Sequence, residues 1–164
     1  MKKYELAVSP HKKYMRLALK EAKKNLTRMH GGPFGACIVR GGKVIALGHN
    51  SVLTNDPTAH AEINAIRSAA KKLKSYDLSG CIIYSTTEPC PMCFSAIHWA
   101  RIDGIVYGNA IADAKKIGFH ELGISAKAMK RLGRSSVKVI GGFLLPECNR
   151  IFRSWALLAN RVVY

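Results

Sequence analysis

The sequence predicts a layered α/β domain, with helices on both faces of one mixed β-sheet. Segments with a helical spacing of apolar residues alternate along the chain with short β-rich runs. Two of these runs, 35–40 and 43–48, are separated only by Gly41-Gly42, which predicts a tight hairpin and therefore at least one antiparallel pair of strands. The 164 residues, 48% of them hydrophobic, have the length and composition of a single globular domain spanning residues 1–164.

The first predicted helix covers residues 11–28, with Ser9-Pro10 as its cap and first-turn proline. Met15, Ala18, Leu19 and Ala22 begin an apolar stripe along it. After the hairpin, the pattern predicts a loop at 50–58, a helix at 59–73, a strand at 81–87, a helix at 91–101, a strand at 102–108, an irregular stretch with short helical pieces at 110–135, a strand at 137–145 and a last helix at 146–160.

The chain is strongly basic. Its 26 Lys and Arg residues exceed its 10 Asp and Glu residues, which gives a formal net charge of +16. Such a charge indicates either a polyanionic partner such as RNA, or a solvated basic surface. The same two interpretations apply to the polar face of the first helix, which carries Lys12, Lys13, Arg16, Lys20, Lys23 and Lys24.

The number and pattern of the cysteines and apolar residues indicate a cytoplasmic protein without a membrane span. Five cysteines are an odd number, and a disulfide framework is not expected. No window approaches the roughly 18 apolar residues of a membrane helix. The apolar stretch that follows Lys2 and Lys3 is too short for a signal peptide.

A candidate metal site lies in two short motifs. His60-Ala61-Glu62 begins one predicted helix, and Pro89-Cys90-Pro91-Met92-Cys93 begins another. Together they form the His-x-Glu and Pro-Cys-x-x-Cys signature of zinc-dependent nucleobase deaminases. His60, Cys90 and Cys93 supply the imidazole and thiolate ligands that Zn²⁺ prefers, and three protein ligands leave one position for water. We therefore expect one catalytic Zn²⁺ per chain.

Glu62 is two residues past His60, so it can lie near the metal without binding it. It is the candidate catalytic base, which takes a proton from water and returns it to the substrate ring and the leaving amine. Two alternatives exist for the Cys-x-x-Cys motif alone, a structural zinc knuckle and a redox pair. A knuckle needs a second close pair of Cys or His, which the sequence lacks. A redox pair does not explain His60-Ala61-Glu62.

Longer blocks of sequence extend these motifs: Gly31-Gly32-Pro33-Phe34-Gly35-Ala36, Asn55-Asp56-Pro57-Thr58-Ala59-His60-Ala61-Glu62, Glu88-Pro89-Cys90-Pro91-Met92-Cys93 and Ala96-Ile97-His98-Trp99-Ala100-Arg101. Through them the sequence resembles the cytidine deaminase-like superfamily. Asp113 ahead of Gly118-Phe119, the late Trp155 and the final Tyr164 make it similar to the small bacterial guanine deaminases within that superfamily. The sequence departs from these relatives at His120, where an acid is common.

The resemblance implies a three-layer α/β/α fold around a five-stranded mixed sheet. It implies that Asn50 contacts the substrate, that Phe34 and Trp99 shape the base pocket, and that Asp113 assists catalysis. It also implies a homodimer in which Tyr164 closes the pocket, often through a tail swapped between subunits, with residues 146–164 as a C-terminal helix and tail over the active site. Each residue has a plainer interpretation: Phe34 and Trp99 as core, Asn50 and Asp113 as local caps, and Tyr164 as a frayed terminus.

The function expected first is hydrolysis of a purine base, guanine, to xanthine and ammonia. The alternative within the same chemistry is a tRNA adenosine deaminase that converts adenosine to inosine, which the charge of +16 favours. An RNA substrate needs an open pocket, whereas a free base needs an enclosed one. The two functions are therefore distinguished by whether the last residues of the chain cover the site. A third alternative is a non-catalytic polyanion-binding module with a structural zinc, against which the intact Glu62 argues.

Overall fold

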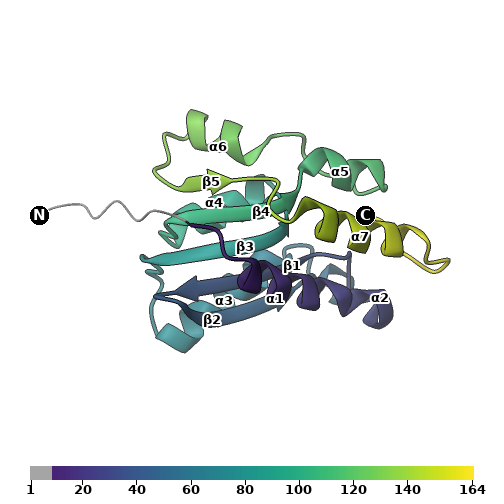
Figure 1. Cartoon of the computed structure of the whole chain (residues 1–164), viewed down its shortest axis with the longest axis horizontal. Helices are drawn as coiled ribbons and strands as arrows, with labels where there is room; N and C mark the ends of the chain where they lie inside the picture. Colours follow the sequence, from purple (N-terminus) through teal and green to yellow (C-terminus); the bar gives the residue numbers. More distant parts are fainter. Residues whose placement is uncertain (1–8) are drawn as a thin grey trace, which may run out of the picture.

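A computed structural model describes residues 9–164, so the stretch after Lys2 and Lys3 lies outside the described residues. Figure 1 shows the helices and strands, which follow one another in the order α1 (Lys12–Lys23), α2 (Asn25–Arg28), β1 (Gly35–Arg40), β2 (Lys43–His49), a 3₁₀ turn (Val52–Thr54), α3 (Ala61–Leu73), β3 (Cys81–Thr87), α4 (Pro91–Trp99), β4 (Gly104–Asn109), α5 (Ile111–Lys116), α6 (Ala126–Leu132), β5 (Lys138–Ile140) and α7 (Leu145–Ala156).

The five strands form one mixed sheet in the order β2-β1-β3-β4-β5. β1 pairs antiparallel with both β2 and β3, and β4 pairs parallel with β3 and with β5. The predicted hairpin is confirmed: Arg40 pairs with Lys43, and the turn between them has positive φ at Gly41 (53°) and Gly42 (76°). Glycine adopts these angles without steric cost, and such turns match the twist of the strands.

Helices cover both faces of the sheet, as predicted (Figure 1). Cys37 and Val39 of β1 belong to the apolar cluster that includes the buried residues of α1, whereas the alternate residues Ala36 and Ile38 belong to the cluster that includes α3 and α4. This alternation is the two-residue period of a strand, and burial on both faces explains why the central strands are apolar throughout. The predicted stripe of α1 is confirmed, because Met15, Ala18, Leu19 and Ala22 are buried.

Several element boundaries differ from the prediction. The first helix begins after His11, whose side chain accepts a hydrogen bond from the backbone of Lys13, so Ser9-Pro10 precedes its cap. This helix is also interrupted at Lys24, where the backbone N–H bonds to the carbonyl oxygens of both Ala22 and Glu21 instead of continuing the α-helical ladder.

The predicted strand at 137–145 has only three paired residues, Lys138–Ile140. Gly141 then packs directly against the ring of Tyr107, Gly142 has φ of 75°, and Leu144 has φ of 53°, so the backbone leaves the extended conformation. The last helix ends at Ala156, and residues 157–164 form an irregular tail. None of the helices in residues 9–164 combines the length and hydropathy needed to cross a membrane.

The register of the sheet brings the predicted site residues to one edge. Gly35 at the start of β1 pairs with His49 at the end of β2, and Thr87 at the end of β3 pairs with Asn109 at the end of β4. Ala36 of β1 pairs with Ser85 of β3, so the β1–β2 pair and the β3–β4 pair end at the same edge of the sheet. The segments that carry Phe34, Asn50 and Cys90 therefore all leave the sheet on the same side.

Candidate active site

Two helix N-termini meet at this edge and carry the predicted metal ligands. His60 is the N-cap residue of α3 and Cys90 is the N-cap residue of α4, with Pro91 in the first turn after it. The Nδ1 atom of His60 lies 3.7 Å from Sγ of Cys90 and 3.6 Å from Sγ of Cys93. The structure thus brings together the three residues that the two motifs predict.

These three side chains fit a zinc ion. Zinc–sulfur bonds of ~2.3 Å and zinc–nitrogen bonds of ~2.0–2.1 Å at tetrahedral angles put a sulfur and a nitrogen about 3.6 Å apart. The His60, Cys90 and Cys93 ligand atoms all lie within 4.8 Å of one another, and within residues 9–164 they form the one group of this kind among His, Cys, Asp and Glu. Three protein ligands are the number found in catalytic zinc sites, whereas structural sites use four.

The hydrogen bond between the two thiols shifts their pKa values in opposite directions. The hydrogen bond from Cys93 lowers the pKa of Cys90 to about 4, and His60 adds to this effect. The same hydrogen bond, together with burial and the carboxylate of Glu62, raises the pKa of Cys93 well above its usual value. A divalent cation would stabilise both thiolates, and the positive end of α4 favours them further.

Glu62 lies in the first turn of α3 and is buried. Its Oε1 accepts a hydrogen bond of 2.9 Å from Ser85 Oγ, and its Oε2 lies 3.5 Å from Sγ of Cys93. Burial raises the pKa of this carboxyl, against the lowering effect of His60. Glu62 is therefore next to the metal ligands, is held by β3, and has a raised pKa, which favours its uptake of a proton.

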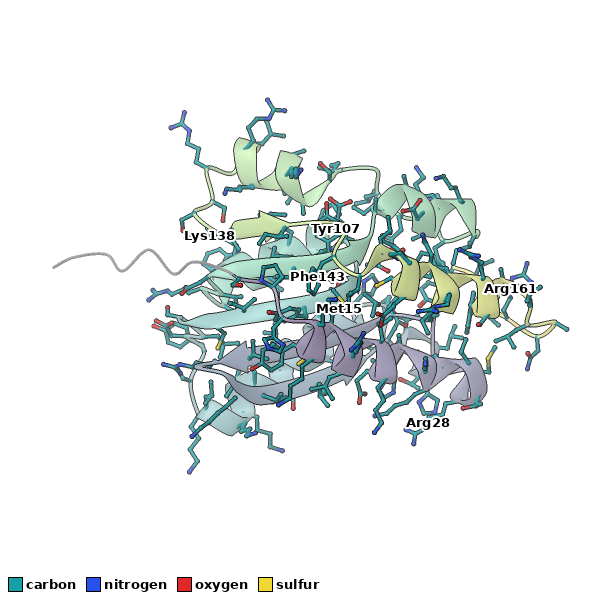
Figure 2. All side chains as sticks on the ribbon, in the orientation of Figure 1. Met15, Arg28, Tyr107, Lys138, Phe143 and Arg161 are labelled. Atoms are coloured by element: carbon teal, nitrogen blue, oxygen red, sulfur yellow. The ribbon has the colours of Figure 1, made fainter. Side chains whose placement is uncertain are left out.

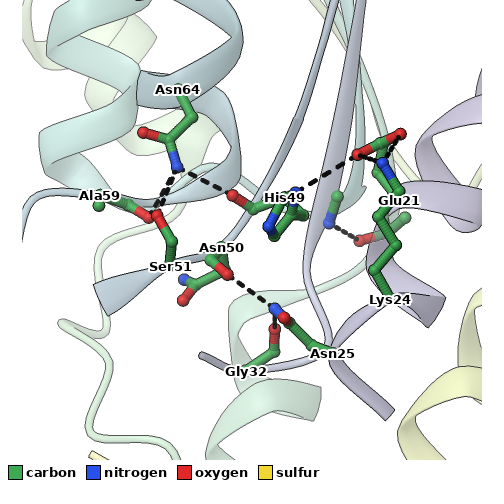
Figure 3. Close-up of polar contacts among 11 residues, drawn as sticks. Glu21, Lys24, Asn25, Gly32, His49, Asn50, Ser51, Ala59 and Asn64 are labelled. Carbon is green, nitrogen blue, oxygen red and sulfur yellow. Dashed lines mark hydrogen bonds and ion pairs between the residues drawn. The ribbon is translucent and has the colours of Figure 1, made fainter. Parts of the chain in front are cut away.

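Asn50 is buried beside the site and is held by residues on both sides (Figure 3). Nδ2 of Asn25 donates to the backbone oxygens of Asn50 (2.7 Å) and Gly32 (2.8 Å). Nδ2 of Asn64 in α3 donates to His49 O, Ser51 Oγ and Ala59 O, at distances of 2.9, 3.0 and 3.2 Å. The segment that carries Asn50 is thus tied to the segment that carries His60.

The chain terminus contacts the same residue. The hydroxyl of Tyr164 donates to Oδ1 of Asn50 (2.7 Å) and accepts from the backbone N–H of Gly32 (2.8 Å). Its backbone oxygen accepts from His120 N (2.8 Å). Its ring lies edge-on to Phe119, with centroids 5.2 Å apart, and Phe119 is in turn edge-on to Phe34 at 4.8 Å. Tyr164 is ordered by these contacts, so the interpretation as a frayed terminus is wrong.

Two sequence-predicted residues lie away from this site in the single chain. Trp99 ends α4 with 80% of its surface exposed, so it is neither in the core nor in the pocket. Asp113 is in the first turn of α5, where its carboxylate accepts from the backbone N–H of Ala110 (3.1 Å) and pairs with Lys116 (3.0 Å). These contacts match the helix-cap interpretation of Asp113, because an acid in the first turn satisfies free N–H groups.

A second acid, Glu121, lies within electrostatic range of the metal ligands, and the sequence reasoning missed it. Burial raises its pKa to about 7; the nearby charges of Cys90 and Glu62 add to the rise, and His60 opposes it. Its carboxyl is therefore within electrostatic reach of the whole metal group. The signal was present in the sequence, since Glu121 is one residue past His120, the position where the resemblance leads one to expect an acid.

The family model for the cytidine and deoxycytidylate deaminase zinc-binding region matches residues 8–109, which include all three ligands and Glu62. The chain belongs to this deaminase family. Its predicted fold is confirmed as well, because solved deaminases share its five-stranded mixed sheet and surrounding helices. The ligand set and the family together identify the cofactor as zinc.

Relatives of two kinds resemble this deaminase. The guanine deaminase of Bacillus subtilis (strain 168) is 40% identical over 155 residues, which is 94% of this chain and 99% of the relative. A tRNA-specific adenosine deaminase of Buchnera aphidicola subsp. Schizaphis graminum is 37% identical over 124 residues, 75% of this chain and 79% of the relative. The solved structure of a guanine deaminase from Nitrosomonas europaea superposes with a TM-score of 0.80 at 30% identity and covers 88% of this chain and 84% of that one.

Proposed function

We propose that this deaminase converts free guanine to xanthine and ammonia. The observation that carries the proposal is the contact between Tyr164 and Asn50. It puts the chain terminus over the part of the site where the base would bind, which we call the base side. A free base must be enclosed to be recognised, whereas a base within RNA must enter from outside. The similarity to the Bacillus subtilis guanine deaminase supports this, since it extends over 94% of the chain.

The hydrogen bonds of Asn50 favour guanine over adenine. Its Oδ1 accepts from Tyr164 (2.7 Å) and from the backbone N–H of Val52 (3.3 Å), which occupies both lone pairs. The amide can then offer only its Nδ2 donors to a base. Guanine presents two adjacent acceptors, O6 and N7, whereas adenine presents the acceptor N7 beside the donor N6, so an amide that offers only donors matches the O6 and N7 pair of guanine better.

The reaction forms a C2–O bond from water and breaks the C2–N bond of the amine. A zinc ion held by His60, Cys90 and Cys93 supplies the Lewis acidity that activates water at neutral pH. Glu62 accepts one proton from the water and delivers it to N3 of the ring. The remaining proton reaches the amine, which leaves as ammonia, and C2 becomes the carbonyl of xanthine. Ser85 orients Glu62 for both transfers through its 2.9 Å hydrogen bond.

Glu121 takes the assisting role that the resemblance suggested for Asp113. With a pKa of about 7, its carboxyl can hold or release a proton at physiological pH. It is on the tail side of the site, since Tyr164 O accepts from the neighbouring His120 N. We assign it to binding the leaving amine or ring N–H of the base.

The exposed Trp99 supports a homodimer. An indole with 80% of its surface in water is unusual for a monomer, and large exposed aromatic groups mark interaction sites. A second copy that covers Trp99 would bring it into a pocket, as first expected, and exchange of residues 157–164 between copies is compatible with that arrangement. Sedimentation of the purified protein at twice the chain mass of 18.0 kDa is the expected result.

We place the dimer in the cytoplasm, in keeping with its five free cysteines.

An ammonia-release screen tests the proposed reaction. Purified zinc-loaded protein is incubated with guanine, adenine, guanosine, adenosine and a tRNA anticodon hairpin, and the products are separated by chromatography. We expect turnover of guanine to xanthine, with adenine slower by about 5- to 150-fold, because one hydrogen-bonding mismatch costs about 1–3 kcal/mol. Turnover of the hairpin alone would instead assign the chain to the tRNA adenosine deaminases.

A further inference from the structure

A basic groove lies between α1 and α7, on the face of the sheet opposite α3 and α4. Its volume is about 630 Å³, and its lining residues are Arg16, Leu19, Lys20, Lys23, Leu26, Glu147, Arg150, Ile151 and Ser154. The two helices run side by side at the front of the sheet (Figures 1 and 2). Leu19 and Ile151 are buried and form the floor, and the basic side chains form the walls.

The charges of the groove are unbalanced. It has four basic side chains and one carboxylate, Glu147, which is already paired with Arg16 at 3.1 Å through two parallel hydrogen bonds. This pairing fixes the guanidinium of Arg16 at the groove wall. Lys20, Lys23 and Arg150 are exposed and take part in no ion pair with the acids of residues 9–164. The groove therefore presents positive charge to any ligand that enters it.

The spacing of the cations suits a chain of phosphates. Arg16, Lys20 and Lys23 follow one another by four and three residues, so they lie on one face of α1. At 1.5 Å per residue they span about 10.5 Å, which is the length of about three stacked nucleotides of one strand at ~3.4 Å each. Arg150 faces them from α7. A single phosphate would be matched by one or two of these cations, whereas a strand engages all of them.

Nothing in the proposed reaction uses this groove, because guanine has no charge and the metal ligands start α3 and α4 on the other face. We propose that the groove between α1 and α7 binds the phosphate backbone of single-stranded RNA. The apolar floor of Leu19, Leu26 and Ile151 offers the sugars and bases a surface on which to pack. This inference does not depend on the identity of the deaminated base.

Fluorescence anisotropy with a labelled, mixed-sequence 15-nucleotide RNA tests the proposal on the full-length, zinc-loaded protein. The groove variant combines Lys20→Glu, Lys23→Glu and Arg150→Glu. The control variant combines Lys74→Glu, Lys127→Glu and Arg134→Glu, which are exposed residues outside the groove, so both variants lower the net charge equally. We expect the groove variant to raise Kd at least tenfold and the control to change it less than threefold.

The salt dependence gives a second readout. Loss of three phosphate contacts should reduce the slope of log K against log salt by about 2, since each contact on a single strand contributes ~0.7. Equal weakening in both variants would attribute binding to the whole charged surface and overturn the proposal. Stoichiometric binding of GMP as tight as that of RNA would make the groove a mononucleotide site and overturn it too. Guanine turnover is measured in parallel and should not change, so failure of either proposal is recognised separately.

Discussion

The metal side and the base side of the active site are built in different ways. On the metal side, His60, Glu62, Cys90 and Cys93 all come from the first turns or caps of two helices, within two short stretches of sequence. On the base side, the residues come from separate segments that meet only in the folded chain: Phe34, Asn50, Phe119, Glu121 and Tyr164.

This difference determines how each side is stabilised and which property a substitution there should change. The metal ligands are held by local helix geometry, and a change there removes the cation or the proton transfer outright. The base side is held by long-range hydrogen bonds such as Tyr164 to Asn50, across 114 positions of sequence. A change there should shift recognition of the substrate more than the chemical step.

Cys93→Ala should have the largest effect. It removes one of three ligands, so zinc should fall from one ion per chain to below roughly a tenth, and deamination should become undetectable. Inductively coupled plasma mass spectrometry of the dialysed protein measures the metal. Cys37→Ala is the matched control, because Cys37 is also buried and free but lies under α1. Full zinc in the Cys93 variant would show that the three side chains are not the metal site.

Glu62→Gln should retain zinc and lower kcat by about 10²–10⁴-fold, the usual contribution of a general acid–base residue. The amide keeps the volume and can still accept a hydrogen bond from Ser85, but it cannot take a proton. Stability should not fall, since the buried carboxyl it replaces has a pKa raised by burial. Steady-state kinetics, zinc content and thermal melting are compared, and a kcat within tenfold of the parent would remove Glu62 from the proton path.

Local patterns explain which predictions from sequence succeeded. The hairpin was predictable because Gly41-Gly42 supplies the positive φ angles that its turn requires. The metal side was predictable because two residues fixed at a helix start, such as Cys90 and Cys93, have a nearly constant separation. The alternation of helices and strands along the chain and the buried stripe of α1 were predictable from the periodicity of the apolar residues.

The base side required information that is not local. Asp113 and Glu121 are both acids near Gly118-Phe119, and only the fold shows that Asp113 caps α5 while Glu121 lies within electrostatic range of the metal ligands. Trp99 ends a helix, and its direction relative to the pocket depends on how that helix packs. Tyr164 has no periodicity to place it, and its position follows from contacts with Asn50, Gly32 and His120.

Replacement of Asp113 and of Glu121 in turn separates their roles. Glu121→Gln should lower kcat/KM by about 10–100-fold at neutral pH, because it removes a titratable group beside the metal ligands. Asp113→Ala should leave kcat/KM within about twofold and cost roughly 0.5–1 kcal/mol of stability through the lost cap of α5. The opposite pattern would return the catalytic role to Asp113. Kinetics and chemical denaturation of both variants provide the measurement.

Tyr164→Phe tests the closure of the base side. The ring contact with Phe119 should persist, and only the hydrogen bonds to Asn50 and from Gly32 are lost. A net hydrogen bond contributes about 0.5–1.5 kcal/mol, so KM for guanine should rise about three- to tenfold with little change in kcat. Discrimination against adenine should fall with it, because the amide of Asn50 is then free to rotate. A change in kcat alone would place Tyr164 in the chemical step.

Asn64→Leu should have a smaller effect on activity than Tyr164→Phe, and it tests whether the two sides are coupled. Asn64 donates to His49 O, Ser51 Oγ and Ala59 O, so it holds the flanks of Asn50 and of His60 at once (Figure 3). Ala59 O also accepts from Ser51 N, so the substitution removes the Asn64 donor from His49 O and Ser51 Oγ, which costs about 1–3 kcal/mol of unfolding free energy.

If Asn64 links the two sides, KM should rise about two- to fivefold while zinc affinity falls, because the segment between Asn50 and His60 gains freedom at both ends. Asn149→Leu in α7 is the control for the substitution itself, since Asn149 is also partly buried in a helix but makes no hydrogen bond to the segment between Asn50 and His60. A rise in KM with unchanged zinc affinity would confine the role of Asn64 to the base side, and the metal side would then be held by the helix starts of α3 and α4 alone.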